Sequence, residues 1–157
     1  MTARPPERPE PLDAGLAAAQ EALVRAMTAG GPLPDGFDAG DVAAAARAIL
    51  GKRAGDTARA WPALAASYGG GWTDAFAAWA AERPTRGSLR DGWDFARAHH
   101  ADLPAAARTE LAVAEARWSY GGDREPRRRL LAVRRVPGGL AVQVRGRLRV
   151  VRRRTMV

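Results

Sequence analysis

The chain has 157 residues, which is enough for one compact domain or for a core with an appendage. It contains no cysteine, and this excludes disulfides, thiolate nucleophiles and cysteine-ligated metals. No stretch has the length of a membrane span or the apolar run of a secretory signal, so we expect a cytoplasmic protein with no membrane partner.

The positive charge is concentrated at the C-terminal end. The formal net charge is +8. Residues 124–157 hold twelve arginines against a single acid, Glu125, and carry +11, whereas the rest of the chain carries −3. A segment with such a charge favours an anionic partner.

Helical patterns dominate the first three quarters of the chain. Residues 1–11 contain four prolines and are predicted to be disordered. Residues 12–120 are predicted to form a helical domain of about six helices. In chain order we expect a helix from Leu12 closed by Gly30-Gly31, one capped by Asp38 that runs to Trp61, one over Pro62–Tyr68, one over 72–82, one capped by Ser88, and one opened by Pro104 that includes Trp118.

The hydrophobic period changes from helical to alternating after residue 121. Leu140, Val142 and Val144 alternate with other residues, and glycines at 138, 139 and 146 mark turns. Residues 121–157 are therefore predicted to form a small antiparallel meander of two or three strands, and the fold class is mainly α. A meander of this size is marginal alone, so we expect it to pack on the helices or on a partner.

No set of residues indicates catalysis. His99 and His100 are adjacent on a predicted helix and point about 100° apart, so they do not readily share a metal. None of the serines lies in a nucleophile-elbow motif, and the glycine run at 69–71 lacks the ending of a phosphate loop. The acidic pair Asp91 and Asp94 is interpreted as a solubilising feature. We expect no metal, no cofactor and no enzymatic activity of its own.

The chain has five tryptophans, at 61, 72, 79, 93 and 118. In an alanine-rich bundle such large side chains are expected to fill the core. The alternative is that one or two of them face a partner.

Arginines interleave with valine and leucine on the predicted strands, so that one face of the sheet can bury while the other presents guanidinium groups. Two functions fit this pattern. The first is binding of a phosphate backbone, which depends steeply on salt. The second is addition of an acidic peptide to a free strand edge. The strands carry no aromatic platform, which makes nucleic acid the less favoured of the two.

The helical part also shows a series of short motifs in a fixed order. These are Arg47 and Gly55, Trp61-Pro62 and Leu64, the aromatics Trp72, Phe76 and Trp79 before Arg83-Pro84, Ser88-Leu89 with Gly92 and Phe95, Leu103-Pro104, and Arg108-Thr109-Glu110-Leu111. In this order they resemble the HvfC/BufC-like family, once described as a putative DNA-binding domain. Leu111 stands where that family has an aromatic residue, and the C-terminal part is shorter than in its typical members.

Members of that family are partner subunits of multinuclear iron-dependent oxidases in the maturation of ribosomally made, modified peptides. The resemblance implies that this chain forms a heterodimer with such an oxidase through its helical domain and presents the precursor's leader peptide through its strands. The residues predicted to contact the leader are Val142, Val144, Arg145, Arg147 and Arg149. The residues predicted to lie at the oxidase interface, or alternatively in the helical core, are Arg47, Trp61, Trp93, Arg108 and Glu110; for the two tryptophans the core is favoured.

Two alternatives remain at this stage. The arginine-rich segment could bind DNA or RNA, or the chain could be a structural adaptor in which that segment has no binding role.

Overall fold

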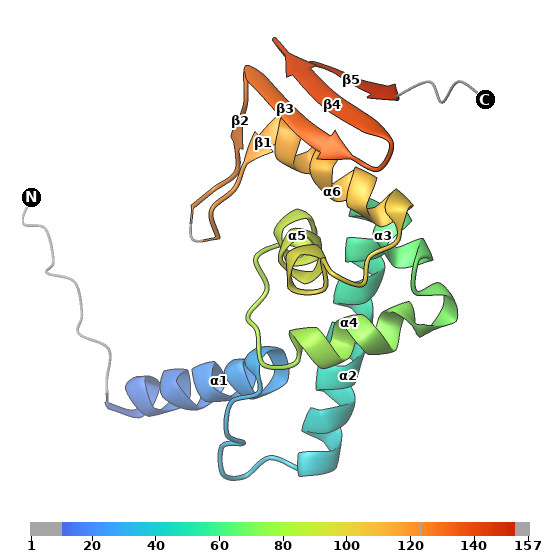
Figure 1. The fold of residues 1–157 in the computed structure, drawn as a ribbon. Coiled ribbons are helices and arrows are strands. Elements are labelled where there is room, and N and C mark those ends of the chain that lie inside the picture. The colour runs from blue at the N-terminus through green and yellow to red at the C-terminus, as the bar shows by residue number, and fades with distance from the viewer. Residues whose placement is uncertain (1–10, 123, 153–157) are drawn as a thin grey trace, which may run out of the picture.

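Helices come first along the chain and strands last, as Figure 1 shows. The computed structural model describes residues 11–122 and 124–152. The helices are α1 (Pro11–Ala29), α2 (Ala39–Ala60), α3 (Pro62–Ala66), the short 3₁₀ helix η1 (Gly69–Gly71), α4 (Trp72–Ala80), α5 (Ser88–Ala98) and α6 (Ala105–Arg117). The strands are β1 (Trp118–Ser119), β2 (Arg127–Arg128), β3 (Leu131–Val136), β4 (Gly139–Val144) and β5 (Arg147–Arg152). The predicted fold class, mainly α with a small antiparallel meander, is confirmed.

Capping residues and prolines in the sequence determine where several helices begin. The Asp41 backbone N–H donates to the Asp38 carboxylate at 3.0 Å, so Asp38 caps α2 as predicted. Pro62 occupies the first position of α3, where its missing N–H costs nothing. The predicted cap of α5 is wrong, because Ser88 is already the first helical residue and Gly87 precedes it. Disorder was predicted for residues 1–11; residues 1–10 lie outside the described residues, and Pro11 is the first residue of α1.

The core of the helical part is aromatic. Trp61, Trp72 and Trp93 are buried in it, while Trp79 and Trp118 are partly buried against it. The rings meet at an angle: Trp61 and Trp93 have centroids 6.0 Å apart and planes inclined at 62°. The prediction that the tryptophans fill the core is therefore confirmed for Trp61, Trp72 and Trp93, whereas Trp79 and Trp118 pack on the core and keep part of their surface exposed.

One buried ion pair joins the central helices. The Arg53 guanidinium on α2 lies 3.1 Å from the Asp91 carboxylate on α5, and both side chains are almost fully buried. Asp91 also accepts from the Thr85 hydroxyl and from the Arg86 backbone N–H, each at 2.8 Å. The prediction that Asp91 and Asp94 merely solubilise the chain is wrong. Asp91 holds α5 to α2, and Asp94 accepts a hydrogen bond from Tyr120 at 2.8 Å.

Both tyrosines of the chain are expected to titrate late in the folded protein. Burial raises the pKa of Tyr68, with a smaller contribution from the negative charge of Asp102. Burial also raises the pKa of Tyr120, and its hydrogen bond to Asp94 adds to the effect. Because the fold favours the neutral phenols, their contribution to stability is complete below pH 10, their ordinary pKa, and is lost as pH rises through the folded values.

The measurement is the near-ultraviolet absorbance of tyrosinate against pH, in buffer and in denaturing urea. The curve in urea is expected at lower pH than the curve in buffer. Coincident curves would contradict the burial of the phenols.

Two small sheets follow α6. β1 pairs with β2, and β3, β4 and β5 form an antiparallel meander in that order. The pairing of β1 with β2 was not predicted, and Trp118 lies in β1 instead of continuing the last helix. The turn between β4 and β5 is Arg145-Gly146, and both residues have positive φ, 44° and 85°. Two such residues define a type I′ turn, which matches the twist of a two-residue hairpin.

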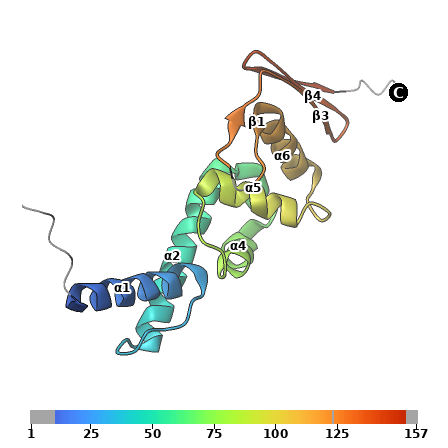
Figure 2. The ribbon, with the colours of Figure 1, turned by 90° about the vertical axis from the view of Figure 1, so that its left-hand side faces the viewer.

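The meander packs on α6. Figures 1 and 2 show α6 between the sheet and the remaining helices. The contact is built from small residues: Ala112 and Ala116 of α6 are buried with Ala132, Val136 and Ala141 of the sheet. The sheet therefore has one face on a helix, as expected for a meander too small to be stable alone.

Within residues 11–122 and 124–152, no helix is both long and apolar enough to cross a membrane.

Candidate functional site

The face of the meander that points away from α6 carries exposed apolar and basic side chains. Residues paired across strands share a face, and the register gives three rows on this outer face. The rows are Leu131–Val144–Arg147, Val133–Val142–Arg149 and Arg135–Leu140–Val151. Leu131 is 71% exposed and Val151 58% exposed, so large apolar groups face solvent here. Such a cluster of exposed side chains is typical of a binding surface.

The inner face packs on α6, and this corrects part of the prediction. The sequence predicted that one face could bury while the other presents guanidinium groups, but Leu140 and Val144 are exposed on the same face as Arg147 and Arg149, and Ala141 and Gln143 are buried instead. The cause is α6, which covers the inner face: its Ala112 and Ala116 pack with Ala132, Val136 and Ala141 of the sheet.

β5 forms an open edge of the sheet. Within the described residues it pairs with β4 alone. Val144 and Arg147 close the two-residue turn, so the backbone groups of residues 147, 149 and 151 point towards β4. The backbone N–H and C=O groups of Leu148, Val150 and Arg152 consequently point outwards, where another strand could accept and donate hydrogen bonds.

The guanidinium groups along this edge are not neutralised by any carboxylate of the described residues. Within residues 11–122 and 124–152, Arg145, Arg147 and Arg149 form no ion pair with a carboxylate. They are exposed and border a depression of about 660 Å³. Its lining consists of Val142, Val144, Arg145, Arg147, Arg149 and Val151.

The structure thus brings all five predicted leader-contact residues together around one depression. We name this surface, with Val151 included, the β5 surface. Val151 was not among the predicted residues. Its pairing with Leu140 would have indicated it, since cross-strand partners share a face, but that register depends on the position of the turn.

The five residues predicted for the oxidase interface separate into three groups. Trp61 and Trp93 are 1% and 0% exposed, so they belong to the core, which was the favoured alternative. Glu110 has a structural contact, because its carboxylate accepts from the backbone N–H groups of Ala63 and Leu64 at the start of α3, at 3.2 and 2.8 Å. Arg47 and Arg108 are exposed and are free to face a partner.

The histidine pair has two different environments. His99 is the C-cap residue that follows α5, and its ring packs on Phe95 with centroids 4.2 Å apart while Nδ1 lies 2.9 Å from the Phe95 carbonyl oxygen. His100 is exposed. In the part of the chain that the structure describes, no group of three or more histidine, aspartate or glutamate side chains could hold a metal ion.

Sequence comparison identifies a relative that matches part of this chain. A UPF0276 protein from Streptomyces avermitilis is 38% identical over 109 residues, which are 69% of this chain but only 22% of that protein. The chain therefore matches only about a fifth of the length of this relative. No solved structure matches the chain.

The family described as SCO6045-like, C-terminal domain, matches residues 17–101, from α1 to just beyond α5. This match spans more than half of the 157 residues. The chain therefore belongs to the family of SCO6045-like C-terminal domains.

Proposed function

We propose that the chain is a non-catalytic partner of a multinuclear iron-dependent oxidase and that it presents the leader of a ribosomally made precursor peptide at the β5 surface. The observation that carries the proposal is the open β5 edge beside Arg147 and Arg149, whose guanidinium groups have no acidic partner among the described residues. An open edge and free cations together suit an extended acidic peptide.

The leader would add as a further strand beside β5. Its backbone would bond the outward N–H and C=O groups of Leu148 and Val150, and its side chains would alternate between the two faces of the sheet. Those on the outer face would meet Val142 and Val144 with their apolar parts, and acidic ones would meet the guanidinium groups of the β5 surface. Main-chain bonds would then supply affinity, and the arginines would select for acidic residues.

The helical half would dock the oxidase. Arg47 on α2 is exposed and available for that contact, whereas Arg108 on α6 is exposed beside the sheet. The relative from Streptomyces avermitilis supports a role beside a larger protein, because its matching region is only 22% of a longer chain. Covalent attachment raises the effective concentration of one region around the other, and this favours their contact when the two act together.

The proposal is tested with a synthetic peptide of about six residues in which glutamate and valine alternate, used as a probe of the β5 surface. We expect the double variant Arg147→Gln/Arg149→Gln to raise its Kd at that surface about tenfold, because two charge-assisted hydrogen bonds are removed. The matched control is Arg25→Gln/Arg59→Gln, which removes the same charge from two exposed, ion-paired arginines on α1 and α2. An equal loss of affinity in both double variants would contradict a site on the sheet.

Strand addition itself has a separate test. N-methylation of alternate backbone amides on the edge-facing side of the peptide should abolish binding, because it removes the donors to the β5 carbonyl oxygens. Methylation of the amides that point away from β5 should be tolerated. Binding that survives both modifications would rule out an added strand.

The oxidase part of the proposal is tested on the neighbouring genes and on their products. A gene for an iron-dependent oxidase and one for a small precursor protein should lie beside the gene for this chain. The purified oxidase should then bind the chain, and Arg47→Glu should weaken that complex without changing the peptide affinity.

Two outcomes would favour the other functions. Tight binding of mixed-sequence duplex DNA at about 150 mM salt would favour a nucleic-acid partner. Unchanged product formation by the oxidase with the Arg147→Gln/Arg149→Gln variant would favour an adaptor whose basic strands are spectators. Point variants are preferable to deletion of residues 124–157, because that deletion would also uncover Ala112 and Ala116 of α6.

A further inference from the structure

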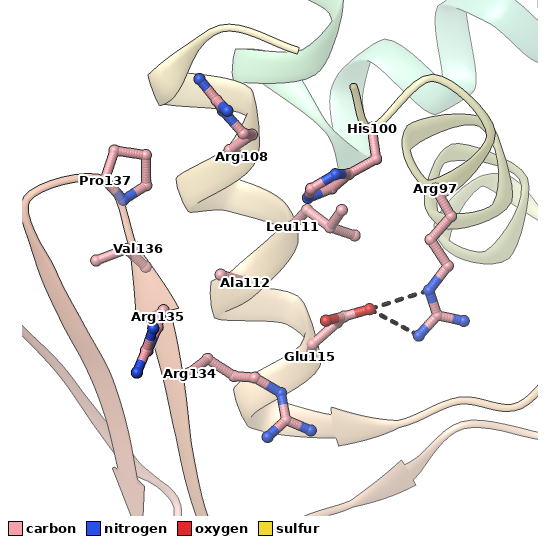
Figure 3. A pocket seen from close by; sticks show the side chains of 10 residues that line it. All are labelled: Arg97, His100, Arg108, Leu111, Ala112, Glu115, Arg134, Arg135, Val136 and Pro137. Carbon is pink, nitrogen blue, oxygen red and sulfur yellow. Dashed lines mark hydrogen bonds and ion pairs between the residues drawn. The ribbon is translucent and has the colours of Figure 1, made fainter. Parts of the chain in front are cut away.

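A second cleft lies on the opposite side of the meander, between the edge of β3 and helices α5 and α6 (Figure 3). Its volume is about 690 Å³. We propose that this cleft, here named the β3 cleft, is a second peptide site that takes an extended segment with carboxylate side chains. It goes beyond the leader site at β5, because β3 and β5 are the two opposite edges of the sheet.

The charges in the β3 cleft favour an anionic occupant. Arg108, Arg134 and Arg135 line it, and none of the three is ion-paired to a carboxylate of the described residues. Its acidic lining residue, Glu115, is already engaged, since Nε and an Nη of Arg97 donate to one carboxylate oxygen at 3.0 and 2.7 Å. The cleft therefore has an excess of unneutralised guanidinium groups.

The spacing of the cations suits an extended chain. Figure 3 shows Arg108 near the beginning of α6 and Arg134 beside its later turns. Arg108 and Glu115 are seven residues apart on the helix, or roughly 10 Å at the helical rise. An extended peptide covers that length with about three residues, and alternate side chains point to the same side. Acidic residues two apart on such a peptide lie on one side of it, about 7 Å from each other, so they would meet the long arginine side chains near the two ends of the cleft.

The backbone of β3 offers the bonds that an added strand needs. Val136 and Gly139 close the turn to β4, so the N–H and C=O groups of residues 131, 133 and 135 point away from β4. The Arg134 guanidinium donates to the Val133 carbonyl oxygen at 3.0 Å. That contact places a donor where the N–H of an added strand would lie. A bound peptide would replace it and release the guanidinium to a carboxylate.

The floor of the cleft favours a peptide over a nucleic acid. Leu111, Ala112 and Val136 are buried side chains that line it, and its lining includes no tryptophan, tyrosine or phenylalanine ring. Apolar side chains that alternate with the acidic ones would pack on this floor. Alternating acidic and apolar residues are therefore the chemistry that the cleft fits.

The experiment places a reporter at each site of the full chain. Because the chain has no cysteine, a single introduced cysteine can be labelled selectively. Ala101→Cys places a dye beside His100 at the β3 cleft, and Arg152→Cys places one at the end of β5. The probe is the peptide of alternating glutamate and valine, titrated at about 50 mM salt, with its glutamine–valine counterpart as the uncharged control.

We expect the dye at position 101 to respond to the glutamate–valine peptide and not to the glutamine–valine peptide. Arg108→Gln/Arg134→Gln should raise the Kd reported at position 101 about tenfold and leave the Kd reported at position 152 unchanged. Arg25→Gln/Arg59→Gln should leave both unchanged. Circular dichroism of each variant checks that the fold is intact.

Failure of this proposal and failure of the leader site have different signatures. A silent dye at position 101, or an unchanged Kd there in Arg108→Gln/Arg134→Gln, overturns the β3 cleft and leaves the β5 surface standing. A silent dye at position 152 with a response at position 101 overturns the β5 surface alone. Displacement of the peptide from position 101 by mixed-sequence duplex DNA at about 150 mM salt would overturn the choice of a peptide occupant.

Discussion

Replacing Asp91 with alanine should lower the free energy of unfolding by about 3–5 kcal/mol, because it leaves the buried Arg53 guanidinium without its counter-charge. The carboxylate also holds the Thr85 hydroxyl and the Arg86 backbone N–H, so the loop before α5 loses its anchor as well. The measurement is urea denaturation followed by tryptophan fluorescence. The control is Asp74→Ala, which removes an exposed acid from the first turn of α4 and should cost about 0.5 kcal/mol.

A second variant distinguishes the effect of removing one charge of the ion pair from the effect of removing both. Arg53→Met/Asp91→Leu removes both charges and should lose less stability than Asp91→Ala alone, because no buried charge is left unpaired. If Asp91→Ala costs no more than Asp74→Ala, the ion pair does not stabilise the fold.

The second large effect is expected at Gly92 on α5. A Cβ atom there would lie 2.3 Å from Cδ1 of Trp61, far inside van der Waals contact. The indole cannot move easily, since it is fully buried and its Nε1 donates to the Leu89 carbonyl oxygen at 3.0 Å. Gly92→Ala should therefore cost on the order of 3 kcal/mol, the upper end of the usual penalty for overpacking.

The control for Gly92 is another helical glycine. A Cβ atom at Gly51 of α2 would meet nothing within 4 Å, so Gly51→Ala should stabilise the protein by up to about 1 kcal/mol through helix propensity. The cause is tested with a double-mutant cycle. In Trp61→Ala/Gly92→Ala the indole that the new Cβ would meet is absent. The loss in the free energy of unfolding should therefore be smaller than the sum of the losses in the two single variants. Additive losses would mean that Gly92 is needed for another reason.

Much of the fold could be predicted because its helix ends are encoded locally. Asp38 and Pro62 act within one turn of their own position, and the glycines at 138 and 146 mark the two turns of the meander. The ion pair of Arg53 and Asp91 could not be predicted in this way. The two residues are 38 positions apart, and a charged residue on a helix is solvated in most proteins.

The candidate site was predictable in its residues but not in its geometry. Arginines between valines indicated a binding strand, and the structure brings those residues together around one depression. Which set of side chains would face solvent depended on α6, because both alternating sets of β4 contain apolar residues. The β3 cleft was not predicted at all, since it forms only where three separate elements meet.

Helix α6 has a consequence for how the protein unfolds. Its Ala107 and Leu111 belong to the aromatic core, whereas Ala112 and Ala116 belong to the sheet contact. Neither the aromatic core nor the sheet can unfold without exposing one side of α6 to solvent. Both should therefore unfold in a single transition. A ligand held only by the strands would therefore raise the melting temperature of the tryptophan core as well, by mass action on the whole cooperative unit.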